Sequence, residues 1–407
     1  MSPLDARTLV LPEQPSPAEG AREMIARIRP HWQRMGITRV ANVTGLDRIG
    51  IPVVMVCRPN ARSLAVSQGK GLDLDSATVS GLMESVELFH AEHIDKPLRL
   101  GSMAELSPSH AFARIDRLAR VAGERHTADR VTLWIEGQDL VSGGARWLPY
   151  ESVRANFTVP APTGSGCFDC SSNGLASGST YGQAMQHGIC EIVERDATAL
   201  WNRMRAAERR ATGLDLDSVA DGRCRDVLDR LSLAGFDTTA WETTSDTGVP
   251  AFFCLIADSR DRSGHHGIGA AAHPAAEVAL LKALVEAAQV RTTYVSGARD
   301  DLHPDEYSES HRENRRRIAE RLRTEHAPLR PLVVVPERTQ AGTGGNIRWL
   351  LDRLAVAGLD EVIAVDLSKE EIGLPVVRIV IPGLEGPDDH DGYMPGERAR
   401  RVMEARG

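Results

Sequence analysis

The sequence predicts an α/β fold, of the α+β kind, in which one large unit combines helices with mixed or antiparallel sheets. A turn glycine, a proline and an apolar run occur together three times, at residues 50–54, 248–252 and 373–377. Glycine permits a tight turn and proline is tolerated where a strand begins, so each of these segments predicts the start of a strand. Helix-forming segments separate them, and no low-complexity linker divides the chain, which favours one continuous unit.

Residues 1–37 are expected to form an arm and a helix that precede this unit. Residues 1–20 are rich in proline, which predicts an extended arm, and residues 21–35 have the pattern of a helix. The main unit is expected to span residues 38–400. The last residues, 401–407, are expected to be a short C-terminal tail.

Helices and strands are interleaved through the main unit. A β-rich stretch is expected at residues 38–58 and a strand at 361–366. Five helices are expected, at residues 75–93, 182–203, 275–291, 306–325 and 346–357. The fourth carries charges of both signs at close spacing, which is typical of a surface helix. Gly358 is placed to end the fifth.

The composition excludes some classes of protein. The 407 residues carry a net charge of −8 and only 4% aromatic residues. Both values argue against a nucleic-acid partner, because phosphate backbones attract positive charge and single strands stack on aromatic side chains. No apolar segment is long enough to cross a membrane, and the N-terminus lacks the apolar core of a signal peptide. We therefore expect a cytoplasmic protein.

The six cysteines are too few for a disulfide framework in a chain of this size. Cys167 and Cys170 form one CxxC pair. A structural zinc site needs about four ligands, and no second CxxC completes the set. Redox chemistry and a simple turn both remain open for this pair.

Three of the predicted helices each carry a glutamate followed three residues later by a second glutamate or a glutamine. The pairs are Glu84/Glu87, Glu191/Glu194 and Glu286/Gln289. Residues three apart share one face of a helix, so each pair presents its oxygen atoms in one direction. Mg²⁺ prefers oxygen ligands and usually binds a few carboxylates together with nucleotide phosphates. Glu84, Glu87, Glu191 and Glu194 are therefore the candidate metal ligands, and Mg·ATP is the candidate ligand.

Two other interpretations of these carboxylates remain open. Glutamates at this spacing are common on exposed helices, although the apolar neighbours of Glu191 and Glu194 favour burial or a functional role. Glu84, together with Glu87 and His90, resembles one half of a di-iron site. The second helix offers Glu191 and Glu194 at the same spacing, with a glutamate where the other half would need a histidine.

Polar and cationic residues lie near the glutamate pairs in the sequence. Lys70 stands between two glycines just before the first pair and suits a phosphate, although no P-loop pattern is present. Ser172 and Asn173 lie in a small-residue turn before the second helix, and helix starts favour phosphate. Arg195 and Arg291 follow the second and third pairs, and arginine binds phosphate oxygens in a bidentate manner. Ordinary turns, helix caps and surface ion pairs are the alternatives.

Taken together, these segments resemble the YcaO family. The first match is SQGKG followed by SGLMESVE, which contains Ser80. The second and most specific is SSNGLASG followed by a helix in which Gln183 precedes Glu191, Glu194 and Arg195 at the family's spacing. The third is ALVEAAQVR at residues 283–291, and VVRIVIPGLEG near the C-terminus is also similar to a family segment. The resemblance extends from about residue 40 to about residue 400.

The resemblance implies a YcaO-type fold around an ATP site, and an enzyme that phosphorylates a backbone amide oxygen of a precursor peptide or protein. A nucleophile then adds to the amide carbon and phosphate leaves. By this resemblance ATP and Mg²⁺ are the cofactors and the four glutamates hold the metal. The residues implied to bind the nucleotide are Lys70, Ser80, Ser172, Asn173, Gln183, Arg195 and Arg291. The residues implied to be catalytic are Arg195, Glu286 and Gln289.

Members of the family differ in the nucleophile that they use. A Cys, Ser or Thr side chain gives an azoline, an amine gives an amidine, and sulfide gives a thioamide, usually with a TfuA-type partner. Azoline-forming members often end in a PxPxP tail, whereas only Pro395 lies near the end here. Leu88 and Ala279 stand where many members have Arg and Ser.

We therefore expect a thioamide-forming enzyme, assisted by a TfuA-like partner or a docking protein that resembles ubiquitin-activating enzymes, and compatible with a homodimer. Azoline or amidine formation is the alternative chemistry. A catalytically lapsed scaffold is the non-enzymatic alternative. The sequence identifies neither the substrate peptide nor the nucleophile.

Overall fold

The computed structural model describes residues 17–405, apart from 259, 261–264, 325–328, 340–341 and 389–391. Most of the predicted arm therefore lies outside the described residues. The helix expected at 21–35 is present in three pieces: α1 (Pro17–Ile28), a 3-10 turn (Arg29–His31) and α2 (Trp32–Met35). Pro30 lies within the turn, and proline has no N–H to continue a helix. Met24, Ile28 and Met35 join the same core as α3, so this segment packs on the main unit.

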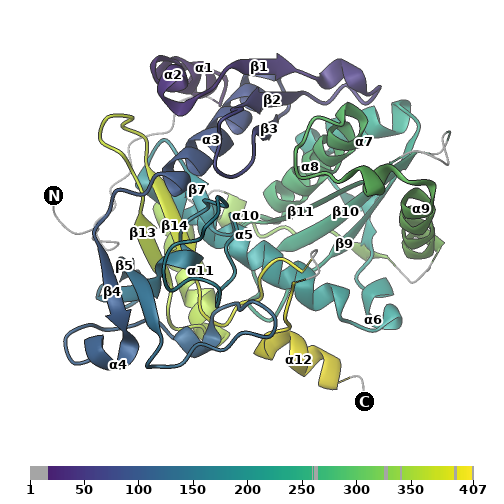
Figure 1. Cartoon of the computed structure of the whole chain (residues 1–407). Coiled ribbons are helices and arrows are strands. Elements are labelled where there is room, and N and C mark those ends of the chain that lie inside the picture. The colour runs from purple at the N-terminus through teal and green to yellow at the C-terminus, as the bar shows by residue number, and fades with distance from the viewer. Residues whose placement is uncertain are drawn as a thin grey trace.

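Three sheets form the framework of the molecule (Figure 1). The first is antiparallel and contains β1 (Arg39–Asn42), β2 (Val53–Cys57) and β3 (Val66–Lys70). The second is also antiparallel and contains β9 (Phe236–Glu242), β10 (Ala251–Asp258) and β11 (Gly267–Ala272), with β10 in the middle.

The third and largest sheet is assembled from distant parts of the chain. Its order is β4-β5-β13-β14-β7, with β6 also paired to β5, and all these pairings are antiparallel. The strands are β4 (Leu98–Ser102), β5 (Val131–Asp139), β6 (Ala145–Pro149), β7 (Leu175–Ser177), β13 (Ile363–Asp366) and β14 (Val376–Val380). A short parallel pair joins β8 (Leu214–Asp215) to β12 (Arg330–Pro331). The prediction of an α/β fold with mixed or antiparallel sheets is confirmed.

The three glycine–proline segments each precede a strand, as predicted. Strands β2, β10 and β14 all begin at the residue after the proline. The three glycines, Gly50, Gly248 and Gly373, have φ angles of 75°, 65° and 69°, which side chains other than glycine rarely adopt. The three strands belong to three different sheets, so a glycine followed by a proline precedes one strand in each sheet.

All five predicted helices are present. They are α3 (Leu74–Glu92), α5 (Tyr181–Asn202), α8 (Ala276–Ser296), α9 (Glu309–Thr324) and α11 (Thr343–Val356). Further helices are α4 (Met103–Leu106), α6 (Ala206–Arg210), α7 (Gly222–Leu233), α10 (Pro336–Thr339) and α12 (Glu397–Glu404). Helix α12 runs across the boundary expected at residue 400.

The first two sheets are built alike, because in each the third strand leads into a long helix that packs back on that strand. Helix α3 packs on β3, and helix α8 packs on β11. Both strands carry glycine at the contact. A Cβ atom on Gly69 would lie 1.9 Å from the carbonyl oxygen of Ala77, and one on Gly269 would lie 2.2 Å from that of Ala283. Glycine is therefore needed for each helix to approach its strand so closely.

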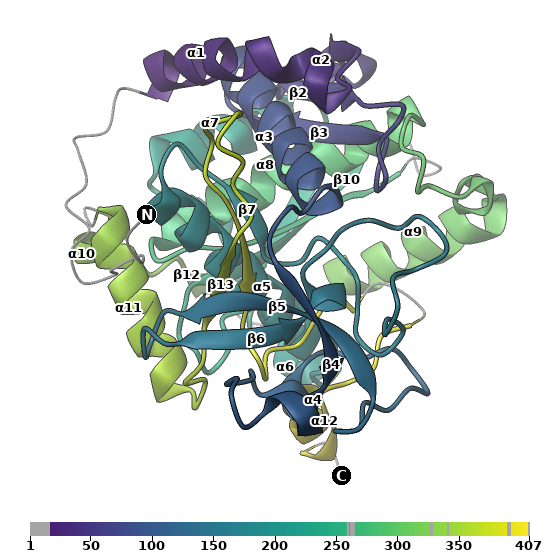
Figure 2. The ribbon, with the colours of Figure 1, turned by 60° about the vertical axis from the view of Figure 1, so that its left-hand side comes forward.

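Helix α5 connects these two units with the large sheet. It contacts β7 and β14 on one side and β10 and β11 on the other. Figure 2 shows α1 and α2 across the top of α3, while α12 and the C-terminus lie at the opposite end of the molecule. Of the helices in the described ranges, none is both long and apolar enough to span a membrane. All six cysteines are free thiols.

Candidate active site

Helix α3 carries the first glutamate pair, and hydrogen bonds hold its two carboxylates against two different sheets. The Oε2 atom of Glu84 accepts a hydrogen bond from the backbone N–H of Gln68 in β3, at 2.8 Å. The Oε1 atom of Glu87 accepts from both the backbone N–H and the hydroxyl of Ser177 in β7, at 2.8 and 2.6 Å. The pair therefore lies where α3, β3 and β7 meet.

Helix α5 carries the second pair, Glu191 and Glu194, through the interior of the molecule. The hydroxyl of Thr180 caps the start of this helix by accepting from a backbone N–H. The residues between and beside the two glutamates, Ile192 and Val193 among them, are buried in an apolar core. The Glu194 side chain is only 13% exposed and meets the neighbouring Arg195 at 3.7 Å.

Helix α8 contributes Glu286, which forms an ion pair with Lys70 at the end of β3. Burial alone would raise the pKa of Glu286, but Lys70 offsets this effect and holds the pKa below its usual range. Glu286 is therefore the one glutamate of the group whose charge is stabilised by a dedicated cation.

The five carboxylates act on one another across the space between α3, α5 and α8. Burial, the largest cause, raises the pKa of Glu84 and of Glu191, with Glu286 adding to both shifts. Burial together with neighbouring carboxylates raises the pKa of Glu87 and of Glu194 to about 8. Like charges that share one site cannot all ionise easily. Without a cation, at least two of these groups therefore hold a proton at neutral pH.

Amide side chains in the same region have polar atoms without a partner. The Oε1 atom of Gln289 and the Nε2 atom of Gln68 are buried and make no hydrogen bond. The Oδ1 atom of Asn173, just before α5, is in the same condition. Buried polar groups are normally satisfied, so unpaired groups beside a cluster of carboxylates fit contacts made to a ligand.

The donor set suits Mg²⁺ that is shared with nucleotide phosphates. In the described part of the chain, no three His, Cys, Asp or Glu side chains are placed to hold a metal ion by themselves. Mg²⁺ rarely needs such a cage, because it usually takes one or two carboxylates and completes its shell with phosphates and water. Glu84, Glu87, Glu191 and Glu194 would supply the carboxylates, with Lys70 beside the phosphates. A di-iron site would need such a group of protein ligands, and none is present among the described residues.

The segment around Lys70 is a strand. Residues Gln68 to Lys70 belong to strand β3, and the adjacent Gly69 provides room for helix α3 and not for a ligand. The segment is therefore part of a sheet, and its glycine serves the packing of a helix. Lys70 nevertheless reaches the carboxylate cluster, because the last residue of the strand directs its side chain toward Glu286.

Arg291 is engaged elsewhere in the interior. Its guanidinium donates to Asp47 at 2.9 Å, lies 3.6 Å from Asp258 and also donates to the carbonyl oxygen of His265. The Arg291 side chain is 8% exposed, and its two acidic partners are buried as well. The structure therefore places Arg291 in an ion-pair cluster of its own.

The other predicted site residues are Ser80, Gln183 and Ser172. Ser80 is one helical turn before Glu84 on α3. Gln183 lies in the first turn of α5, where its Oε1 atom accepts from the backbone N–H of Ser179 at 3.0 Å. The Ser172 side chain is exposed, in the turn that precedes Asn173.

Two arginines near the site were missed in the sequence. Arg378, in the middle of β14, is 2% exposed and donates to the carbonyl oxygens of Ser152 and Ser171, while its Nη1 atom has no partner. It favours ionisation of Glu191, as Arg299 does for Glu84. An arginine inside the apolar run VVRIVI is a signal that could have been used. No pattern in the sequence points to Arg299.

The CxxC pair is unsuited to thiolate chemistry as it stands. Burial raises the pKa of both the Cys167 and the Cys170 thiols. Each thiol lies against a backbone carbonyl oxygen, of Arg125 at 3.7 Å and of Arg154 at 3.4 Å. These contacts favour a structural role for the turn.

Comparison with known proteins places this site in context. Residues 68–385 match the model of the YcaO cyclodehydratase family, which is described as binding ATP and Mg²⁺. An uncharacterized protein in the tfuA 3′ region of Rhizobium leguminosarum bv. trifolii is 34% identical over 371 residues, which cover 89% of this chain and 87% of the relative.

Two solved structures share the fold. One is YcaO from Methanopyrus kandleri bound with AMPPCP and Mg²⁺, at a TM-score of 0.67 and 23% identity, with 93% of each chain covered. The other is a heterocyclase in complex with substrate and cofactor, at a TM-score of 0.72 and 21% identity. The match covers 92% of the present chain but only 54% of the heterocyclase, so the present chain corresponds to about half of that protein.

Proposed function

The chain belongs to the YcaO family, and from this premise we propose that it converts a backbone amide of a peptide or protein into a thioamide. As a member of the family it is an enzyme that uses ATP and Mg²⁺ to modify a peptide backbone. The proposal concerns what that statement leaves open: the residues of the site, the nucleophile and the partner.

The observation that carries the proposal is the group of five interacting carboxylates on α3, α5 and α8. The raised pKa values of Glu87 and Glu194 mean that the cluster lacks enough positive charge to ionise fully, and a divalent cation bound with phosphates would supply that charge. A buried group of like charges lowers the stability of the free protein. Its presence is explained if the charges bind a ligand.

Each residue of the cluster then has a task. Glu84, Glu87, Glu191 and Glu194 bind the metal, and Lys70 holds Glu286 in place while offering positive charge to a phosphate. When bound, Mg·ATP supplies the phosphoryl group that activates the amide oxygen. Glu286 and Gln289 face the same space and are proposed to orient the amide, and Arg195 to meet the phosphates.

The choice of sulfur as nucleophile is supported by the relative from the tfuA 3′ region, which the chain matches over most of its length. We propose a TfuA-type protein as the partner that helps to deliver the sulfur. The likeness to a heterocyclase keeps azoline formation as the competing product. Both products require the same activated amide and differ only in the nucleophile.

Two measurements test the proposal. Glu191→Gln and Glu194→Gln should each weaken Mg·ATP binding in calorimetry by about 100-fold or more, since each removes a charge-assisted ligand. Glu397→Gln, an exposed residue of α12, is the matched control and should bind like the wild type. Unchanged affinity in both site variants contradicts the assignment of the metal ligands.

The product is tested by mass spectrometry of peptides from cells that express the wild type or Glu191→Gln. Exchange of oxygen for sulfur adds about 16 Da to the modified peptide, whereas dehydration to an azoline removes about 18 Da, and both follow from activation of the amide oxygen. A loss of 18 Da, dependent on Glu191, would replace the thioamide proposal with the azoline one.

A further inference from the structure

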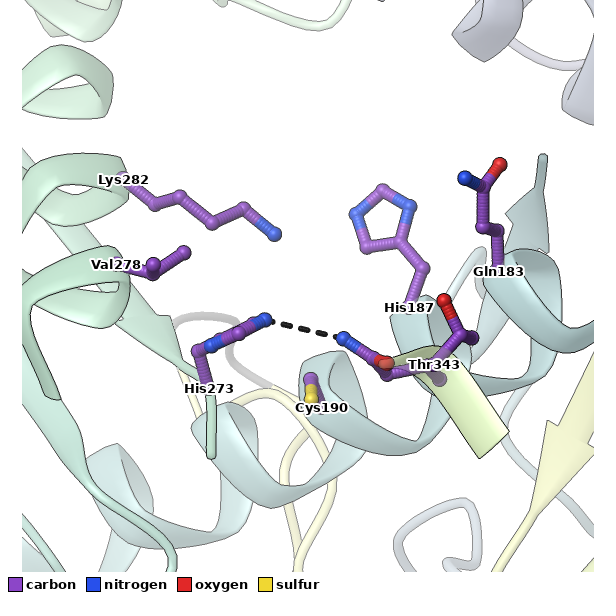
Figure 3. Close-up of a pocket in the computed structure, with 8 residues that line it drawn as sticks. Gln183, His187, Cys190, His273, Val278, Lys282 and Thr343 are labelled. Carbon is purple, nitrogen blue, oxygen red and sulfur yellow. Dashed lines mark hydrogen bonds between the residues drawn. The ribbon is translucent and has the colours of Figure 1, made fainter. Parts of the chain in front are cut away.

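A cavity of about 340 Å³ lies beside the carboxylate cluster, and Gln183 is the one residue of the predicted site that lines it. It is bounded by the first half of α5, the first half of α8, the end of β11 and the start of α11. Figure 3 shows the side chains of His187, His273 and Lys282 directed into this space from three of these elements.

The cavity adjoins the cluster along both helices. Lys282 lies four residues before Glu286 on α8, and His187 lies four residues before Glu191 on α5, so each lies about 6 Å along its helix axis from a carboxylate-bearing residue. Lys70, which pairs with Glu286, also lowers the pKa of His187. A molecule in the cavity would therefore sit next to whatever binds the carboxylates.

The cavity is electropositive. Among the described residues, Lys282 makes no ion pair and no hydrogen bond, and no carboxylate lines the cavity. The charge of Lys282, followed by burial, lowers the pKa of His187, although His187 is exposed to the solvent in the cavity. Burial, followed by Lys282, lowers the pKa of His273 to about 4. Both imidazoles are thus neutral, and one uncompensated positive charge remains.

The two histidines are not equivalent. The Nδ1 atom of His273 accepts from the backbone N–H of Ala275 at 3.0 Å, so its proton resides on Nε2, 3.0 Å from the side-chain amide of Gln186. With the amide turned so that its oxygen faces the ring, Nε2–H donates to Gln186 Oε1, an atom that otherwise has no partner among the described residues. His273 is therefore fully engaged. His187 has no hydrogen-bond partner among the described residues, which leaves a neutral imidazole nitrogen available to accept a hydrogen bond from a ligand.

We propose that this cavity holds the anionic sulfur nucleophile, as hydrosulfide or as the terminal thiocarboxylate of a carrier, with Lys282 opposite its charge and His187 as the hydrogen-bond acceptor. This inference rests on the proposed thioamide function. A cation that makes no ion pair, beside a neutral acceptor, suits a small anion that carries a proton. The absence of carboxylates among the lining residues makes the cavity unsuited to a second Mg²⁺.

The step balances without an oxidant or reductant. The sulfur of HS⁻ forms a bond to the activated amide carbon, and the carbon–oxygen bond then breaks as inorganic phosphate leaves with the electron pair. The S–H group donates a hydrogen bond to His187, its proton leaves with the departing phosphate, and the carbon keeps a C=S bond. With a thiocarboxylate the same carbon–sulfur bond forms, and water then cleaves the carbonyl–sulfur bond to release the carrier as a carboxylate.

Binding of two probes tests the inference in the full-length protein saturated with Mg²⁺ and a non-hydrolysable ATP analogue. The probes are sodium hydrosulfide and thioacetate, which represent the free and the carrier-bound source, with acetate as the oxygen control. Calorimetry should show that Lys282→Gln weakens binding of the preferred probe by about 10-fold or more, because a charge-assisted contact is lost. His187→Gln should weaken hydrosulfide binding by a smaller factor, and Lys282→Arg should retain most of the affinity.

Lys96→Gln, which removes the same charge from a half-exposed surface position, is the matched control and should bind both probes like the wild type. All variants should bind the ATP analogue with wild-type affinity. A parallel loss of nucleotide affinity in Lys282→Gln would assign the cavity to the nucleotide and overturn the inference, as would equal affinity for either probe with and without Lys282. The mass of the wild-type product judges the thioamide proposal separately, since a gain of about 16 Da without probe binding contradicts only the cavity.

Discussion

Helix α5 carries two buried acids on opposite faces, Glu194 and Asp196, and their surroundings differ in one decisive respect. Asp196 is fully buried and accepts hydrogen bonds from Arg398 at 2.8 and 3.0 Å and from the backbone N–H of Glu385 at 3.0 Å. Glu194 faces other glutamates, and Arg195 meets it only at 3.7 Å. One acid has a fixed cationic partner, and the other lies among like charges.

The difference separates a structural acid from one that is reserved for a ligand. Burial alone would lower the pKa of Arg398, yet Asp196 and Asp246 raise it above its ordinary value. Burial raises the pKa of Asp196 as well, and the contacts with Arg398 and with the backbone N–H of Glu385 oppose that shift because they favour the ionised form. Glu194 has no comparable set of donors, so its carboxyl keeps a proton until a cation arrives.

The largest expected effect is the loss of the cation on the Asp196 side. Arg398→Leu should lower the free energy of unfolding by about 3–5 kcal/mol, because it leaves a buried carboxylate without its partner. Guanidinium denaturation measures this change. Arg401→Leu, which removes an exposed arginine from the same helix, should cost no more than about 0.5 kcal/mol. Similar losses in both variants would show that Arg398 is an ordinary surface contact.

The opposite sign is expected on the Glu194 side in metal-free protein. The pKa of Glu194 is about 8 in the folded chain and near 4.5 when unfolded, so the stability of the wild type declines as the pH rises between these values. Glu194→Gln should reduce this decline, to which Glu87 also contributes, and leave the variant more stable by about 1–3 kcal/mol at pH 8, because each pKa unit is worth about 1.4 kcal/mol before solvent screening. Thermal denaturation in EDTA from pH 5 to 8.5 measures it, with Glu397→Gln as control. A variant that is less stable than the wild type at pH 8 would place Glu194 in the same class as Asp196.

A smaller effect is expected on ligand binding. Metal ligands must be ionised, and Glu87 and Glu194 both have pKa values of about 8, so Mg·ATP binding at pH 7 should release about one or two protons. Affinity should then rise by about 10-fold per pH unit for each proton released between pH 6 and 8. Calorimetry in buffers of different ionisation enthalpy counts these protons, and Glu87→Gln should reduce the count. Binding without proton release would mean that the cluster is already ionised.

The same contrast explains what the sequence could and could not predict. The three glutamate pairs were identified from a spacing of three residues, and the strands β2, β10 and β14 from a glycine followed by a proline, because both rules are local. The packing role of Gly69 was not predicted, since its neighbour is helix α3, which reaches the glycine only after the chain folds back. The partners of Asp196 and Glu286 lie about 200 residues away, so only the tertiary structure distinguishes the paired acid from the unpaired one.

Arg291 gives the finest test of the contrast, because the sequence suggested a nucleotide contact while the fold supplies two acidic partners, Asp47 and Asp258. If Arg291 is structural because it is already paired with buried acids, Arg291→Lys should lower the thermal midpoint, since lysine cannot replace the contacts of the planar guanidinium. It should leave Mg·ATP affinity within about 2-fold, less than about 0.5 kcal/mol. Lys70→Gln is the comparison, since Lys70 lies in the carboxylate cluster and its loss should change affinity more. If Arg291→Lys weakens binding by 10-fold while the midpoint stays unchanged, an acidic partner does not mark a residue as structural, and Arg291 belongs to the nucleotide site.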